Sequence, residues 1–370
     1  MKSPLNLKKI VAKNYINAIG WRTNKKLLLI ESDDWGAIRM PSKTVYDSLC
    51  SQGAGEGCYF DVYDSLESSE DLELLFEVLS SVKDSQGNAV VMEPFAVVAN
   101  PNYEAIEGNG FSEYVYEPFV DTYHRFIHTE NSFETIKEGM RAGIWYPQFH
   151  GREHIQVNRW MKALQSGDKL VRLEFSSRAF HSGCLPSNVD YYNAFDYDSK
   201  DELHQLKDIV REGLNIFEQL YGYRPIALCS PCGFTSQELI DFSSQEGICL
   251  RGGQFRTPNG DGSYKRINNY WGTRGINDMR VYRRNCKFEP AKNHNIDWVD
   301  QCLSEIKIAF RWGKPVVIDS HRVNYIGSIS PENRDYTLKE LKRLLKEIVK
   351  RWPEVEFVNS EQLYNEMLKK

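Results

Sequence analysis

The chain has 370 residues, of which 41% are hydrophobic and 26% charged, and its net charge is −5. This composition is ordinary for a globular protein, and the length suits one large α/β domain or two average ones. The negative charge argues against nucleic-acid binding, which usually requires a basic face. No apolar run is long enough for a membrane span.

Two features bear on the cellular compartment. Residues 1–22 are basic but lack both a continuous apolar stretch and a small-residue cleavage site, so no signal peptide is predicted. The eight cysteines have no disulfide-framework spacing and are expected to be reduced thiols. We therefore expect a cytoplasmic protein, while its oligomeric state stays open.

Apolar strand-like runs alternate with helical patterns over most of the chain. The first run ends at a pair of aspartates, and Pro94 interrupts the second. Strands are predicted at residues 26–30, 89–99, 144–149, 225–229, 248–250, 315–318 and 355–358. Helices are predicted at residues 70–82, 132–141, 154–164, 201–221, 236–245, 297–310 and 338–350. This alternation predicts an α/β fold, a deformed (β/α)7-type barrel of parallel strands.

Three stretches interrupt the alternation, near residues 100–131, 173–199 and 251–295. They are rich in Gly, Asn and aromatic residues. In barrels of parallel strands, the loops at the carboxyl ends of the strands build the functional site. The chain has no internal repeat and no clear linker. We therefore predict a single catalytic domain over residues 1–370, with loop insertions at these three places.

Three short motifs follow predicted strands and carry groups suited to catalysis. Asp33 and Asp34 form an adjacent carboxylate pair, His150 and His154 are spaced i and i+4, and His321 ends a later strand. The two imidazoles share a face if their segment is helical. A carboxylate and two histidines can hold a zinc-like ion, and the remaining carboxylate and histidine can act as base and acid. Each motif alone is weak, but their shared position at strand ends favours one site.

With these motifs, residues 25–360 resemble the polysaccharide deacetylase family, the NodB-homology carbohydrate esterases. The resemblance implies a deformed barrel and a divalent metal, for which zinc is expected. It also implies a metal-dependent hydrolase that removes an acyl group, expected to be acetyl, from an acetylated saccharide or saccharide precursor. The implied roles are general base for Asp33, metal ligands for Asp34, His150 and His154, and general acid for His321.

The chain departs from the family pattern at the third and fourth motifs. Residues 229–233 lack the expected arginine and aromatic residue, and no acidic partner for that arginine is visible near residues 250–253. We hypothesise that Arg251 supplies the missing guanidinium. Asp319 stands where the family has a leucine, and we hypothesise that it orients His321.

Candidate substrate-binding residues are Arg251 and four aromatic residues that could serve as sugar platforms, Trp35, Tyr146, Trp271 and Tyr325. The sequence leaves the sugar, the acyl group and the N- or O-linkage open. Three alternatives remain. The chain could be a non-catalytic carbohydrate-binding protein on the same fold, a thiol–disulfide oxidoreductase using Cys229 and Cys232, or a glycoside hydrolase using two carboxylates.

Overall fold

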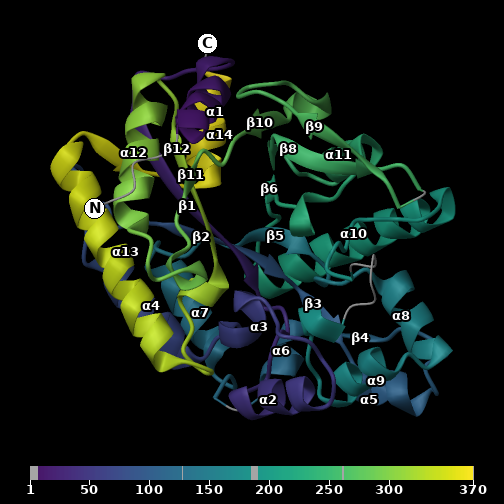
Figure 1. The fold of residues 1–370 in the computed structure, drawn as a ribbon. Helices are drawn as coiled ribbons and strands as arrows, with labels where there is room; N and C mark the ends of the chain where they lie inside the picture. The colour runs from purple at the N-terminus through teal and green to yellow at the C-terminus, as the bar shows by residue number, and fades with distance from the viewer. Residues whose placement is uncertain (1–6, 127, 185–190, 261, 370) are drawn as a thin grey trace.

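The computed structural model describes residues 7–126, 128–184, 191–260 and 262–369. Within these residues, nine strands form one sheet that curls into an incomplete barrel with helices around it (Figure 1). The paired strands of this sheet run parallel. Eight of them follow the order β10 (Arg280–Tyr282), β7 (Leu250–Gly252), β6 (Ala227–Leu228), β5 (Gln148–Gly151), β2 (Met92–Val97), β1 (Lys26–Trp35), β12 (Val316–His321) and β11 (Cys286–Lys287), and β13 (Val355–Phe357) also pairs with β1.

The predicted fold class, an α/β fold with parallel strands, is therefore confirmed. Most predicted helices are present with small shifts at their ends, namely α4 (Ser69–Ser80), α7 (Ser132–Arg141), α10 (Lys200–Tyr221), α11 (Gln237–Gln245), α12 (Trp298–Arg311) and a longer α13 (Pro331–Arg351). Helices that were not predicted are α1 (Leu7–Ala18), α2 (Lys43–Ser51), α3 (Tyr59–Tyr63), α5 (Tyr103–Gly108), α6 (Phe119–Tyr123), α9 (Lys169–Ser176) and α14 (Ser360–Leu368).

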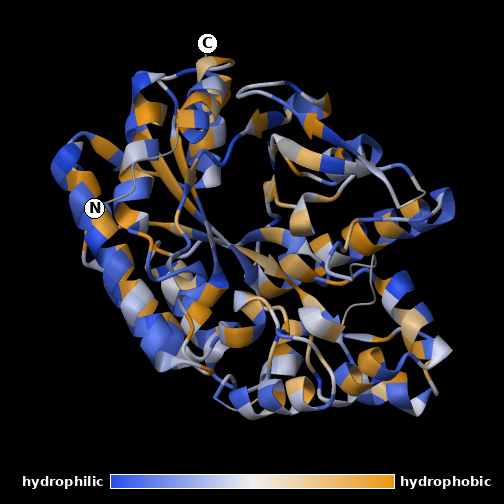
Figure 2. Cartoon of the chain, viewed as in Figure 1, coloured by the Kyte–Doolittle hydropathy of each residue, from blue (hydrophilic) through white to orange (hydrophobic). Residues whose placement is uncertain are grey.

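The apolar residues of β1 explain its central place in the sheet. Leu28 and Ile30 pack in the large cluster that the surrounding helices share, whereas Leu27 and Leu29 pack in a separate cluster with residues from other strands. Side chains of a strand alternate between the two faces of the sheet, so β1 is buried on both faces. Figure 2 shows the same contrast, with mainly hydrophobic central strands and a largely hydrophilic α13 at the edge of the molecule.

The predicted loops contain short elements of their own. Two antiparallel hairpins lie in these regions, β3 (Ala99–Pro101) with β4 (Tyr116–Pro118), and β8 (Gln254–Pro258) with β9 (Tyr264–Asn268). Part of the insertion near residues 173–199 lies outside the described residues. None of the described helices is both long and apolar enough to cross a membrane.

The segment from His150 to His154 is not helical, so the condition under which the two imidazoles would share a helical face is not met, and the helix predicted from residue 154 begins three residues later. His150 lies in β5, His154 lies in the loop that follows, and α8 begins only at residue 157 (Val157–Ser166). Gly151 has a φ of +130°, which departs from strand geometry, and the side chain of Gln156 caps α8 by accepting a hydrogen bond from the backbone of Arg159. The four-residue spacing from His150 to His154 therefore crosses the end of a strand and a loop, not one turn of a helix.

Candidate metal centre and acid–base pair

The pairing of β1 with β12 brings the Asp33–Asp34 motif and the His321 motif together. Asp33 lies opposite His321 in the register of the two parallel strands, and Glu31 lies opposite Asp319. The pairing of β1 with β2 is irregular between Ser32 and Trp35. Such an irregularity redirects side chains at the end of a strand. Asp33 and His321 are thus fixed by the sheet itself.

The backbone at Asp34 separates the two adjacent carboxylates. Asp34 has a φ of +76°, in the left-handed region that few residues other than Gly, Asn and Asp adopt. This conformation turns Asp34 toward the histidines of the second motif, while Asp33 meets the guanidinium of Arg284. The two adjacent carboxylates therefore have different partners, histidines for Asp34 and an arginine for Asp33.

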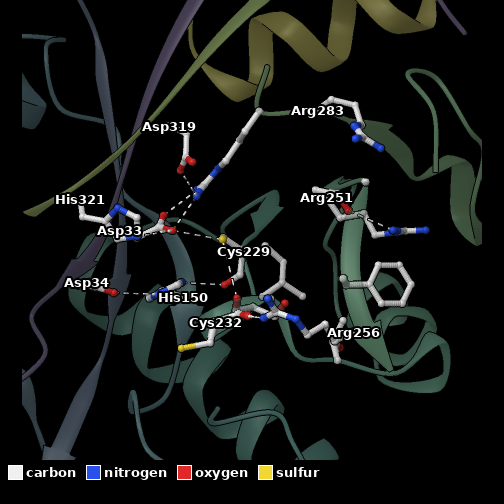
Figure 3. A pocket seen from close by; sticks show the side chains of 18 of the residues that line it. Asp33, Asp34, His150, Cys229, Cys232, Arg251, Arg256, Arg283, Asp319 and His321 are labelled. Atoms are coloured by element: carbon white, nitrogen blue, oxygen red, sulfur yellow. Dashed lines mark hydrogen bonds and ion pairs between the residues drawn. The ribbon is translucent and has the colours of Figure 1, made fainter. Parts of the chain in front are cut away.

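Potential ligand atoms of Asp34, His150 and His154 lie within 4.8 Å of one another. Figure 3 shows Asp34 beside His150. One carboxylate oxygen of Asp34 lies 3.4 Å from Nε2 of His150 and 3.2 Å from Nε2 of His154. Burial alone would raise the pKa of Asp34, but its contacts with the rings of His150 and His154, with the charges of His154 and His321, lower it well below the usual value. The ionised carboxylate and two ring nitrogens have the composition of a three-ligand shell for a divalent ion.

The surroundings of His150 fit such a role. Its Nδ1 lies 2.8 Å from the backbone carbonyl oxygen of Cys229, which fixes the ring orientation. Its Nε2 is buried, and within the described part of the chain its polar contact is the 3.4 Å approach to Asp34, which does not have the geometry of a hydrogen bond. A buried polar atom without a hydrogen-bond partner calls for an explanation such as an ion. In the loop that leads to His154, Arg152 and Glu153 form a bidentate ion pair with two hydrogen bonds.

Arg284 binds Asp33 through both carboxylate oxygens, at 2.6 and 2.7 Å. The same guanidinium also donates to Glu31 and to Asp319. Burial by itself would raise the pKa of Asp33, but the charge and hydrogen bonds of Arg284, with the charges of His150 and His321, bring it down to about 2. Asp33 is therefore ionised at neutral pH.

His321 is held by Glu289, whose carboxylate lies 2.5 Å from Nδ1 of the ring. The second oxygen of Glu289 accepts a hydrogen bond from Asn324. Burial alone would lower the pKa of His321, but the charge and hydrogen bond of Glu289, with the charges of Asp34 and Asp33, raise it to about 10. Nε2 of His321 remains 4.0 Å from Asp33. A protonated imidazole thus stands beside an ionised carboxylate.

The structure corrects both hypotheses about the divergent motifs. Arg284, not Arg251, supplies the guanidinium on Asp33, and Glu289, not Asp319, binds the ring of His321. Both residues lie in the stretch predicted as a loop insertion, where very short strands give almost no periodic signal. The signal in the sequence is the β-favouring pair Val281–Tyr282, which indicates a short strand just before Arg284.

The structure also contradicts the four predicted sugar platforms. Trp35, Trp271 and Tyr325 are 2%, 1% and 0% exposed, so their rings belong to the core. Trp35 packs edge-on against Trp145, and Tyr146 stacks on Tyr223. None of these four predicted rings lines the cavity that contains Asp33 and Asp34, whereas Arg251 does. The aromatic residues that line it include Phe60, Tyr192 and Phe255.

Cys229 and Cys232 both line this cavity, but Cys229 has the wrong environment for redox chemistry. Burial raises the pKa of the Cys229 thiol well above its usual value. Redox-active thiols need the opposite shift, because the thiolate is the nucleophile. The Cys229 thiol lies 3.6 Å from a carboxylate oxygen of Asp33. The oxidoreductase alternative is thereby disfavoured.

We expect Glu289→Gln to lower the pKa of His321 by about 1–3 units. The buried ring would lose the carboxylate charge that offsets its burial, so it would release its proton at a lower pH. NMR titration of the His321 ring in both proteins measures the shift. Asp319→Asn is the control, because Asp319 binds Arg284 rather than His321. A His321 pKa unchanged in Glu289→Gln would contradict the assignment.

No family model matches the chain, and no curated protein is similar to it. Similar solved structures include a protein from Mycobacterium smegmatis described as a polysaccharide deacetylase, with 10% identity, a TM-score of 0.47 and coverage of 95% of this chain and 93% of that one. A protein from Pseudomonas aeruginosa PAO1 with the same description has 13% identity, a TM-score of 0.46 and coverage of 92% and 91%. The PuuE allantoinase has 13% identity, a TM-score of 0.46 and coverage of 93% and 91%. Similarity at this level concerns the fold alone, so function is argued from the residues of the site.

Proposed function

We propose that the chain is a metal-dependent hydrolase that removes an acyl group, acetyl in the first instance, from a saccharide or saccharide precursor. The observation that supports this proposal is the convergence of Asp34, His150 and His154 beside a second pair, Asp33 and His321. A binding protein has no need for an ionised carboxylate and a protonated imidazole at the same ion site. The resemblance of the three motifs to polysaccharide deacetylases supplies the substrate class.

In this proposal Asp33 and His321 carry out the proton transfers. Arg284 and Glu289 keep them in the required protonation states. Asp34, His150 and His154 would hold a divalent ion, which would supply Lewis-acid polarisation of the acyl carbonyl. Asp33, kept ionised by Arg284, accepts the proton of the attacking water. His321, kept protonated by Glu289, donates its proton to the departing sugar nitrogen or oxygen. The strand register holds base and acid side by side throughout.

The first test is the ion itself. We expect His154→Ala to lose most of the bound divalent metal, because it removes one of three ligands. Elemental analysis of purified wild-type and variant protein measures the loss. His204→Ala is the matched control, since His204 is exposed on α10. Equal metal content in wild-type and His154→Ala protein would contradict the ligand assignment.

The second test is hydrolysis. Release of acetate from a panel of acetylated sugars and sugar phosphates should be detectable with the metal-loaded wild-type protein and absent after removal of the metal by a chelator. Saccharide binding without any acyl release across the panel would favour the non-catalytic alternative. The panel also determines whether the bond cleaved is an amide or an ester, which the residues alone leave open.

A further inference from the structure

Helix α1 is attached to the rest of the protein mainly by polar contacts. Asn17 is the one buried residue of this helix. Its side-chain oxygen accepts a hydrogen bond from Asn285, whose backbone carbonyl oxygen accepts one from Lys13. The side-chain oxygen of Asn14 accepts a hydrogen bond from the indole of Trp312. No residue of α1 belongs to a hydrophobic cluster of the described core.

The opposite side of α1 is apolar and exposed, at the outside of the molecule (Figure 1). Leu7, Val11 and Tyr15 follow one another at intervals of four residues, and their exposed fractions are 75%, 60% and 57%. Residues four apart lie on the same face of an α-helix. Ile19, just beyond the last helical residue, is also exposed. We call these four residues the α1 stripe.

This arrangement reverses the usual one for a helix at a protein surface. Such a helix normally turns its apolar side to the core and its polar side to water. Half of the large apolar side chains that are exposed in the described part of the chain belong to the α1 stripe. Single exposed apolar residues are ordinary, but a contiguous group of them marks an interaction surface. The α1 stripe is therefore a candidate binding surface.

The charge of the same segment indicates the kind of partner. Residues 1–30 contain six lysines, one arginine and no acidic residue, although the whole chain has a net charge of −5. Lys8 and Lys9 are exposed on α1, next to Leu7 at the start of the stripe. A helix that combines an apolar stripe with neighbouring lysines is typical of proteins that bind anionic lipid surfaces. Charge and hydrophobicity therefore favour a membrane.

A second copy of the chain fits the α1 stripe less well. Four side chains form a much smaller patch than the roughly 800 Å² per partner that a standard protein interface buries. Two copies related by a twofold axis would also bring the lysines of both α1 helices together, and like charges repel each other. An anionic lipid surface has neither disadvantage, because it is extended and carries the opposite charge.

We propose that α1 attaches the protein to the surface of an anionic membrane, with the α1 stripe at the boundary between lipid headgroups and acyl chains. Leu7 and Val11 supply the apolar contact, and Tyr15 lies at the headgroup level, where tyrosines are favoured. Lysines beside the stripe attract the lipid phosphates. None of the stripe residues lines the cavity of the candidate metal centre. The attachment therefore goes beyond the proposed hydrolysis and does not depend on it.

Cosedimentation with lipid vesicles tests the apolar contact. We expect the full-length protein to bind vesicles of equal parts phosphatidylcholine and phosphatidylglycerol, and the double variant Leu7→Gln/Val11→Gln to bind them at least about tenfold more weakly. Ile276→Gln/Ile296→Gln is the matched control, because it also removes two exposed apolar side chains, 40% and 38% exposed, but neither lies on α1. No binding by wild-type protein, or equal binding by Leu7→Gln/Val11→Gln, would overturn the proposal.

The lysines allow a second test that does not change the apolar residues. Lys8→Gln/Lys9→Gln should weaken binding to the same vesicles by about fivefold or more, because each lysine near an anionic surface contributes attraction. Lys342→Gln/Lys350→Gln, which removes two lysines from α13, is the control. If circular dichroism shows that Leu7→Gln/Val11→Gln does not fold, this comparison decides. Unchanged binding by Lys8→Gln/Lys9→Gln counts against the proposal.

Two further measurements separate the membrane from a second copy and from the proposed function. In analytical ultracentrifugation, a wild-type dimer that disappears in Leu7→Gln/Val11→Gln, without vesicle binding, would assign the α1 stripe to a second copy and overturn the proposal. Acetate release from a soluble acetylated sugar should be the same in wild type and Leu7→Gln/Val11→Gln, because the stripe does not line the cavity. Vesicle binding that depends on the stripe, without any hydrolysis, would support the attachment and contradict the hydrolase.

Discussion

Asp33→Asn is expected to reduce turnover of a demonstrated substrate by about 10²–10⁴-fold while the bound metal is retained. An amide cannot accept a proton from water at neutral pH, whereas the ionised Asp33 can. Metal retention is expected because Asp34, His150 and His154 form the candidate ligand set without Asp33. Steady-state kinetics together with elemental analysis of the same preparation measures both quantities.

Asp319→Asn is the matched control for this variant. It also removes a carboxylate from Arg284, but it leaves Asp33 in place with both of its hydrogen bonds. Turnover within a few-fold of wild type in Asp319→Asn would assign the loss in Asp33→Asn to the base itself. Near-wild-type turnover in Asp33→Asn would show that another group accepts the proton.

Arg322→Met is expected to lower the free energy of unfolding by about 3–5 kcal/mol. Arg322 is fully buried directly after His321, and its guanidinium binds Asp64 through two hydrogen bonds of 3.0 Å and Glu67 through one of 2.9 Å. Methionine would fill part of the space but leave two buried carboxylates without their cation. Urea denaturation followed by circular dichroism measures the change.

Arg343→Met tests whether the effect comes from burial. Arg343 is 43% exposed and pairs with Asp297 and Glu340 at the surface of α13. Exposed pairs contribute only about 0–1 kcal/mol, because water and salt screen them. A loss in Arg322→Met no larger than in Arg343→Met would show that Asp64 and Glu67 are neutralised or hydrated in the variant.

The sequence predicted the strands that have long apolar runs and the residues directly after them. The runs before Asp33 and His321 indicated both the fold class and the proximity of these two residues, because parallel strand ends meet at one edge of a sheet. Their position required no knowledge of distant contacts. The chain order of the motifs was sufficient to place Asp34 with His150 and His154.

Arg284 and Glu289 escaped prediction for a different reason. They lie beside β10 and β11, which have three and two residues, too few for a hydrophobic period to show. Their roles depend on contacts with Asp33 and His321, which lie far from them in sequence. The aromatic platforms failed because ring chemistry alone does not distinguish a core residue from a cavity residue, as the buried Trp271 illustrates.

The register between β1 and β12 has a consequence for folding during synthesis. Asp33 and His321 are neighbours in the sheet, yet most of the chain lies between them in sequence. Until β12 is synthesised, β1 of a nascent chain lacks two of its three partner strands, β12 and β13, and its Asp33–Asp34 pair lacks His321. Long-range parallel pairing of this kind forms slowly. For the proposed hydrolase, activity should consequently require β12, because fragments that end before this strand lack His321.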